Sequence, residues 1–253
     1  MRRGMSTLAV IGIFSVARIA FAEQTLESVE NDVEKMWAKI NSFSANVTSD
    51  TNVTIGPATM KTHATGTLEC LKKGEQSLFR LDMVNKIDTG IPLAGAMEQK
   101  MLSVFDGKAI FNDMEAMGMR QVFRVDPEEA GKQGPMTGKS MFETLRAQGE
   151  LKLLPDATID GKSVYVVEVT PSPDTKAAAP MDVGLMRVYI SKELGLQVKM
   201  EVLDEKAQPL STTVYNDIKV NVALAPERFV YTVPEGVKVQ DMSEIKKLQE
   251  SLR

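Results

Sequence analysis

The segment Met101–Phe123 places more large apolar side chains on a few short strands than one covered sheet face requires. Two apolar runs are joined at Asp106-Gly107, and a third short run follows a group of methionines. Asp-Gly between alternating apolar runs is a strong hairpin signal, because a type I′ turn needs positive φ at both central residues. Either both faces of this hairpin are buried, or one face lines an apolar hollow.

Alternation of apolar and polar residues dominates the chain after its first helix and predicts a mainly antiparallel sheet of roughly nine to eleven strands. That first helix, Thr25–Ser42, carries its apolar residues on one stripe. Ser140–Gln148 is predicted to be a short second helix, and Pro171–Pro180 a mobile loop. Phe229–Val233 is the last predicted strand, and a short amphipathic helix, Ser243–Arg253, ends the chain.

The first 22 residues have the composition of a secretory signal peptide. Arg2 and Arg3 precede the apolar run Leu8–Phe21, which ends in the small-x-small sequence Ala20-Phe21-Ala22. The run is too short for a stable membrane span. We therefore expect residues 1–22 to be cleaved after export and residues 23–253 to fold as a single domain.

The charge and the scarcity of reactive side chains exclude several classes of protein. Loss of Arg2, Arg3 and Arg18 with the leader takes the formal charge from −4 to about −7, which argues against nucleic acid as a partner. Cys70 and His63 are the only cysteine and histidine, so an intramolecular disulfide and a His- or Cys-rich metal site are excluded. No nucleophile and base stand out together, and we expect neither catalysis nor a cofactor.

Three methionines, Met114, Met117 and Met119, follow the hairpin turn. Thioether sulfur suits Cu(I), which makes copper binding one interpretation. The favoured interpretation is a flexible apolar surface that adapts to different ligands, since the chain has 16 methionines in all. We therefore expect no metal site.

A series of short motifs resembles, in order along nearly the whole chain after the leader, the outer-membrane lipoprotein carrier (LolA-like) family. Each motif is unspecific alone, and their order and spacing carry the resemblance. They are a helix end at Trp37–Phe43, a Gly-x-Leu strand at Gly66–Cys70 leading into Phe79-Arg80-Leu81-Asp82, an Asp-Gly-Lys hairpin at Phe105–Phe111, a strand ending in proline at Gly161–Pro171, and closing strands at Tyr215–Ile218 and Phe229–Val237.

The resemblance implies an α+β fold. In it a mainly antiparallel sheet curves into an open half-barrel, with an N-terminal helix and a small helical lid over the concave face. It also implies a monomeric periplasmic carrier whose apolar cavity binds acyl chains of lipoproteins or another lipid and moves them across the cell envelope toward the outer membrane. Its partners would be a membrane donor and an outer-membrane acceptor that bind transiently. The alternative is an envelope regulatory sensor that binds an amphiphile and signals to a membrane partner.

Arg80 alternates with Phe79 and Leu81 and is expected on the opposite face of their strand. There it either donates a hydrogen bond to the lid, as the resemblance implies, or forms a salt bridge on the convex face. A one-residue error in register exchanges the two faces of a strand, so the face that points inward stays open. Large apolar residues are the candidate cavity lining: Trp37, Ile40, Leu68, Phe79, Leu81, Phe105, Phe111, Met114, Met117, Phe123 and Phe142.

Overall fold

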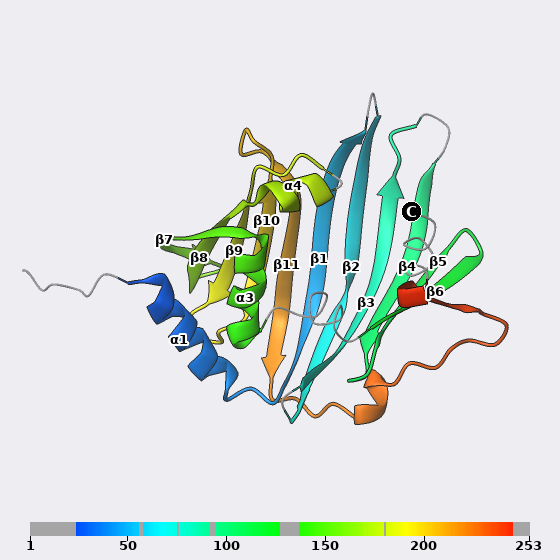
Figure 1. Ribbon diagram of the computed structural model, residues 1–253, viewed down its shortest axis with the longest axis horizontal. Helices are drawn as coiled ribbons and strands as arrows, with labels where there is room; N and C mark the ends of the chain where they lie inside the picture. Colours follow the sequence, from blue (N-terminus) through cyan, green and yellow to red (C-terminus); the bar gives the residue numbers. More distant parts are fainter. Residues whose placement is uncertain are drawn as a thin grey trace, which may run out of the picture.

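The computed structural model of the protein describes residues 24–55, 58–74, 76–91, 95–126, 137–179 and 181–244. The expected leader, residues 1–22, lies outside these ranges. Within them, one sheet of 12 strands is accompanied by short helices (Figure 1). The elements are α1 (Leu26–Trp37), β1 (Ser42–Ile55), β2 (Ala58–Lys73), β3 (Gln76–Asp88), β4 (Ala96–Phe105), β5 (Ile110–Ala116), β6 (Met119–Val125), α3 (Gly138–Gln148), β7 (Gly149–Ile159), β8 (Lys162–Pro171), α4 (Pro173–Ala178), β9 (Leu185–Ser191), β10 (Gln197–Leu203), β11 (Pro209–Val220), the 3₁₀ helix η1 (Pro226–Phe229) and β12 (Val239–Asp241).

The sheet is open, with β12 at one edge and β7 at the other. Its strand order is β12-β6-β5-β4-β3-β2-β1-β11-β10-β9-β8-β7. Two antiparallel meanders, β1 to β6 and β7 to β11, are joined where β1 pairs with β11, and β12 pairs in parallel with β6. The predicted α+β fold, a mainly antiparallel sheet that does not close into a barrel, is therefore confirmed (Figure 1).

We call the face of the sheet on which α1 and α3 pack the inner face, and the opposite one the outer face. Residues that pair in successive strands share a face. One such row runs from Val47 to Gly66, Met83 and Met101 and lies on the inner face. A Cβ on Gly66 would lie 1.9 Å from the backbone oxygen of Asp82, so β2 and β3 approach closely at the centre of the row.

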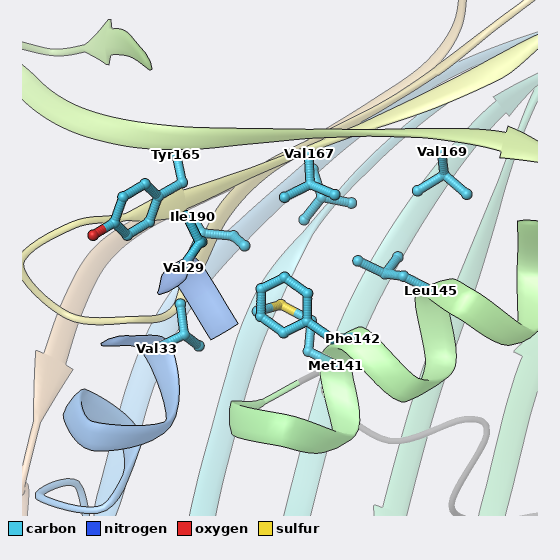
Figure 2. Close-up of a cluster of buried hydrophobic side chains, with 10 residues drawn as sticks. Val29, Val33, Met141, Phe142, Leu145, Tyr165, Val167, Val169 and Ile190 are labelled. Carbon is cyan, nitrogen blue, oxygen red and sulfur yellow. The ribbon is translucent and has the colours of Figure 1, made fainter. Parts of the chain in front are cut away.

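The helices α1 and α3 bury their apolar sides against β8 and β9 (Figure 2). α1 begins with a capping box, in which Thr25 accepts a hydrogen bond from the backbone of Ser28. Burying a large apolar side chain contributes about 1.5–3 kcal/mol, so the cluster formed here fixes both helices on the inner face. Its buried members are Val29, Val33, Met141, Phe142, Leu145, Tyr165, Val167, Val169, Val188 and Ile190.

The middle helix is confirmed, whereas two other predictions of local structure differ from what is observed. The first helix ends at Trp37, because β1 already begins at Ser42. The predicted loop 171–180 contains the helix α4. Its start is favourable, with Ser172 accepting a backbone hydrogen bond as N-cap and proline in the first turn.

Between β11 and β12 the chain crosses the outer face of the sheet and does not form the predicted strand. The predicted strand Phe229–Val233 is wrong, since η1 ends at Phe229 and residues 230–234 belong to no strand. Pro226 and Pro234 flank this stretch, and proline cannot donate to a strand ladder. Tyr231 stacks on Phe111 of β5 with 5.0 Å between ring centroids. Residues 245–253 of the predicted tail helix lie outside the described ranges.

The position of the C-terminal segment decides whether both faces of the hairpin are buried or one face lines an apolar hollow. Near the Asp106 turn, Phe111 lies on the outer face beneath the C-terminal segment, while Phe105 and Ile110 pack on the inner face. Protein therefore covers both faces at that end of β4 and β5. Toward the other end of β4, Met101 faces the cavity described below.

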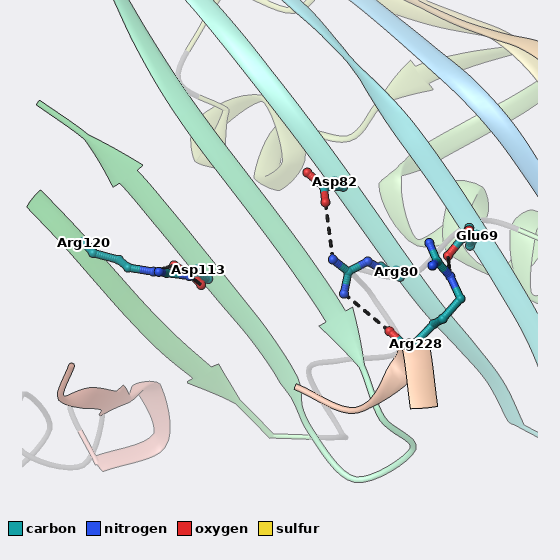
Figure 3. A network of polar contacts seen from close by, with 6 residues as sticks. All are labelled: Glu69, Arg80, Asp82, Asp113, Arg120 and Arg228. Atoms are coloured by element: carbon teal, nitrogen blue, oxygen red, sulfur yellow. Dashed lines mark hydrogen bonds and ion pairs between the residues drawn. The ribbon is translucent and has the colours of Figure 1, made fainter. Parts of the chain in front are cut away.

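A buried carboxylate holds the C-terminal segment to the hairpin. Asp113 is 3% exposed and accepts hydrogen bonds from Arg120 Nε at 2.8 Å and from the Tyr231 hydroxyl at 2.8 Å. The Asp113–Arg120 pair links β5 to β6 on the outer face (Figure 3). Burial by itself would raise the pKa of Asp113, but the hydrogen bonds from Arg120 and Tyr231 outweigh it and hold that pKa below its usual value.

Replacing Asp113 with asparagine should destabilise the protein, because Arg120 and Tyr231 then face a neutral acceptor. We expect Asp113→Asn to lose about 1–3 kcal/mol of the free energy of unfolding, the usual range for losing a charged hydrogen-bond partner. Urea unfolding at neutral pH measures the loss. Asp182→Asn, at an exposed site, is the matched control and should change this free energy by less than about 0.5 kcal/mol. Equal stability of the two variants would contradict the anchoring role of Asp113.

The contribution of Asp113 should also depend on pH in one direction. An unfolded chain has an aspartate pKa of about 3.9, and the folded protein lowers the pKa of Asp113. Its stabilisation is therefore present above about pH 4 and is lost as the pH falls through the folded pKa. The difference in unfolding free energy between wild type and Asp113→Asn should shrink as the pH falls from about 5 through the lowered pKa of Asp113. A constant difference over this range would argue against the ion pair.

Candidate functional site

A cavity of about 300 Å³ lies on the inner face beside the two helices. Its floor comes from β1, β2, β3, β4, β10 and β11, and its side from residues next to the start of α3. The lining residues are Phe43, Ala45, Val47, Ser49, Leu68, Phe79, Leu81, Met83, Met101, Thr137, Leu196, Gln197, Met200, Thr213, Tyr215 and Ile218.

The lining is mostly apolar and contains no acidic or basic side chain among the described residues. Ser49 and Thr213 face each other across β1 and β11, with their hydroxyl oxygens 2.9 Å apart. Burial raises the pKa of Tyr215, so its hydroxyl stays protonated at neutral pH. Apolar walls with a few neutral polar groups are typical of sites for small apolar or amphiphilic ligands.

The side of the cavity depends on close contact between α1 and the start of α3. Gly138 has φ of +54°, and a Cβ there would lie 2.3 Å from Trp37 Cδ1, so a larger residue would push the helices apart. The Lys72 ammonium lies 4.0 Å from the centroid of the Trp37 ring, a cation–π contact that helps to hold the ring in place. The backbone of Thr137 forms a β-bridge with Leu196, which brings the start of α3 onto the first residues of β10.

The structure places three of the sequence-predicted residues, Leu68, Phe79 and Leu81, in the lining of this cavity. Trp37 and Ile40 belong to the apolar cluster that packs directly beside it. Their binding of a ligand stays a prediction.

Other predicted residues lie away from the lining, although some share its face. Phe105 packs on Phe79 with ring centroids 6.0 Å apart, one step beyond the cavity. Met114 pairs with Met101, and Phe123 shares the inner face further toward the edge of the sheet.

Three predicted residues lie where they cannot line the cavity. Phe111 is on the outer face beneath Tyr231. Met117 forms the turn between β5 and β6 with φ of +53° and is 78% exposed. Phe142 is fully buried in the cluster between α3 and the sheet.

Arg80 points to the outer face, as its alternation with Phe79 predicts. Its guanidinium donates to the backbone oxygen of Arg228 at 3.4 Å and pairs with Asp82 at 3.3 Å (Figure 3). It therefore contacts the C-terminal segment and not the helices of the inner face. Arg228 in turn pairs with Glu69 at 2.7 Å, so both arginines fasten that segment to β2 and β3.

Several lining residues, among them Met101, Gln197, Met200 and Tyr215, were missed by sequence reasoning. Met200 alternates with polar neighbours. This pattern identifies one face of a strand, but it does not show that the face lines a cavity. The cavity becomes visible only once β11 is known to pair with β1, and no local pattern specifies that partner.

Outside the cavity, the described residues include no group of three or more His, Cys, Asp or Glu side chains that could hold a metal ion. Burial raises the pKa of Cys70 to about 12, so its thiol stays protonated and unreactive. His63 is half exposed and lies 2.7 Å from Asp50. In the described part of the chain, no helix has the length and apolarity needed to cross a bilayer.

A charged side chain in the lining should weaken the binding of apolar ligands. Met101→Glu places a carboxylate in the cavity, and we expect at least about tenfold weaker binding of an uncharged fluorescent apolar probe, because a buried charge is costly. Met117→Glu, at the exposed turn, is the matched control and should bind like wild type. Fluorescence titration gives the Kd values, and thermal melts establish folding. Equal Kd values for the two folded variants would show that the probe does not enter this cavity.

The sequence matches no protein-family model and no curated protein. Solved structures do match it. An uncharacterized conserved protein from Thermus thermophilus superposes with a TM-score of 0.52 at 14% identity, covering 86% of this chain and 99% of that chain. This likeness shows a shared fold.

Two further matches have lower TM-scores. The MucA/MucB complex of Pseudomonas aeruginosa matches with a TM-score of 0.40 at 16% identity, covering 81% of this chain and 60% of that chain. A putative outer membrane lipoprotein-sorting protein domain from Vibrio parahaemolyticus matches with 0.35 at 14% identity, covering 80% of this chain and 96% of that chain. The function has to be argued from the cavity.

Proposed function

We propose that the protein is a non-catalytic carrier that binds the apolar chain of a lipid or lipidated protein in the inner-face cavity. The observation that supports it is a cavity of about 300 Å³ with apolar and neutral polar walls. Ligand pockets in proteins hold about 300–1,000 Å³ and are lined mainly by apolar side chains. Because the cavity is at the lower end of this range, it suits one chain rather than several.

Transfer energetics determine what such a carrier needs. Each methylene removed from water contributes about 0.8 kcal/mol, so a chain of about 16 carbons gains roughly 12 kcal/mol against water. Against a bilayer the gain is close to zero, because the chain already lies in hydrocarbon. The carrier therefore needs a donor that releases the lipid to it and an acceptor that binds the lipid slightly better.

Because we expect a cleaved leader, we propose that this activity lies in the periplasm, between a membrane donor and an outer-membrane acceptor. An envelope sensor could use the same cavity, and the two functions differ in the lifetime of their complexes. A carrier releases each partner after transfer, whereas a sensor stays bound to the membrane protein that it regulates.

The protein should carry a ligand when it is purified from the envelope of cells that export the full chain. We expect native mass spectra to show an added mass that denaturing spectra release as one lipid or acylated molecule. The stripped protein should then take up the same molecule from lipid vesicles. Met101→Glu should carry less of it, while Met117→Glu should carry as much as wild type.

A protein that is always recovered empty, and that takes up nothing from vesicles, would overturn the proposal. Crosslinking and pull-down in the same cells separate the two functions. Short-lived contacts with membrane proteins support a carrier, and a stoichiometric complex with one membrane protein would replace the carrier by the sensor.

A further inference from the structure

Gln197 is the polar residue that the apolar cavity does not explain. It is the first residue of β10, it lines the cavity, and it is 9% exposed. Its side-chain oxygen Oε1 is buried and has no hydrogen-bond partner among the described residues. Buried polar side chains in proteins nearly always have a partner, so an unpaired one needs an explanation.

The neighbours of Gln197 do not supply the missing donor. Leu196 offers only an apolar side chain, and the lining hydroxyls of Ser49 and Thr213 are paired with each other. Thr137, at the start of α3, makes no capping hydrogen bond with its side chain, and it also lines the cavity. The backbone of Thr137 pairs with that of Leu196, the residue before Gln197. Thr137 and Gln197 therefore form one polar corner of a mostly apolar wall, which also carries Ser49, Thr213 and Tyr215.

The partner for this corner has to be an uncharged donor. No basic side chain among the described lining residues could balance an anionic ligand group, and no acidic one a cationic group. Burying an unpaired charge costs far more than burying a hydroxyl or an amide. The atom left unpaired is an oxygen, which can only accept a hydrogen bond.

We infer that the cavity selects an uncharged amphiphile whose hydroxyl or amide N–H donates to Gln197 Oε1, with the alkyl chain lying across the strands. This inference rests on the proposed function and adds the chemical class of the ligand. Because Oε1 is buried in the empty cavity, the Gln197 side chain has to shift when the donor of the ligand reaches it. From β10 the chain extends over β11, β1, β2 and β3 toward Met101 on β4, five strand spacings or roughly 24 Å along the sheet.

Three ligands with the same chain length test this selection. They are 1-decanol, which donates a hydrogen bond, decyl methyl ether, which does not, and decanoate, which is charged at neutral pH. Each displaces an uncharged fluorescent probe from the purified full-length protein. We expect wild type to bind decanol about tenfold more tightly than the ether and more tightly than decanoate.

The variant Gln197→Leu should lose this preference. It should bind decanol and the ether with equal Kd values, and its empty form should melt no lower than wild type, because leucine removes an unpaired buried polar group. Gln240→Leu, on the exposed side of β12, is the matched control and should keep the wild-type preference.

The possible results separate the proposed carrier function from the proposed role of Gln197. If none of the three ligands displaces the probe, the cavity does not bind alkyl chains and the proposed function fails. If wild type binds decanol and the ether equally, or if Gln197→Leu keeps the preference, the role of Gln197 is overturned while the carrier function stands. Should Gln197→Leu not fold, the ratio of the two wild-type Kd values still tests the inference.

Discussion

The pairing of β1 with β11 is the constraint on which both the sheet and the cavity depend. At the Ser49–Thr213 contact these strands meet across 164 residues of chain. The junction turns two local meanders into one continuous floor, and Val47 and Tyr215, which are partners across it, both line the cavity. Closing so long a loop costs chain entropy, which the apolar packing of the inner face has to offset. The cavity therefore forms only when the two ends of the chain close this long-range pairing.

Local patterns predicted the parts of the fold that depend on neighbouring residues. Alternation and turn residues located most strands, and alternation alone placed Phe79 and Leu81 on one face, which does line the cavity. Phe111 is a residue whose environment local patterns could not predict. Its strand was predicted, but the cover over its face comes from Tyr231, and the neighbouring contact of Tyr231 with Asp113 spans 118 residues. Gln197 could not be assigned for the same reason, since a polar residue at the start of a strand gives no local sign that it faces a cavity.

The cavity combines an adaptable wall with one polar requirement. Met83, Met101 and Met200 all line it, and their unbranched thioether side chains can change rotamer to follow chains of different shape. Such a wall discriminates poorly between chains, because one methylene more or less changes the binding free energy little. An unpaired acceptor such as Gln197 discriminates by chemistry instead of shape. The methionines would then set how broad the range of chains is, and the polar corner would set which linkage is accepted.

The strand β12 gives the sheet two unlike edges. A long unpaired strand edge invites pairing with another chain. β12 has only three residues and pairs with Val122–Arg124 of β6, whereas β7 is the last strand on the other side of the described sheet. Molecules with two long open edges could add head to tail without limit. With one such edge, a copy can join only a second copy through the same strand, and growth ends at a pair. The three-residue parallel strand thus interrupts the edge of β6 and leaves β7 as the long strand edge of the described sheet.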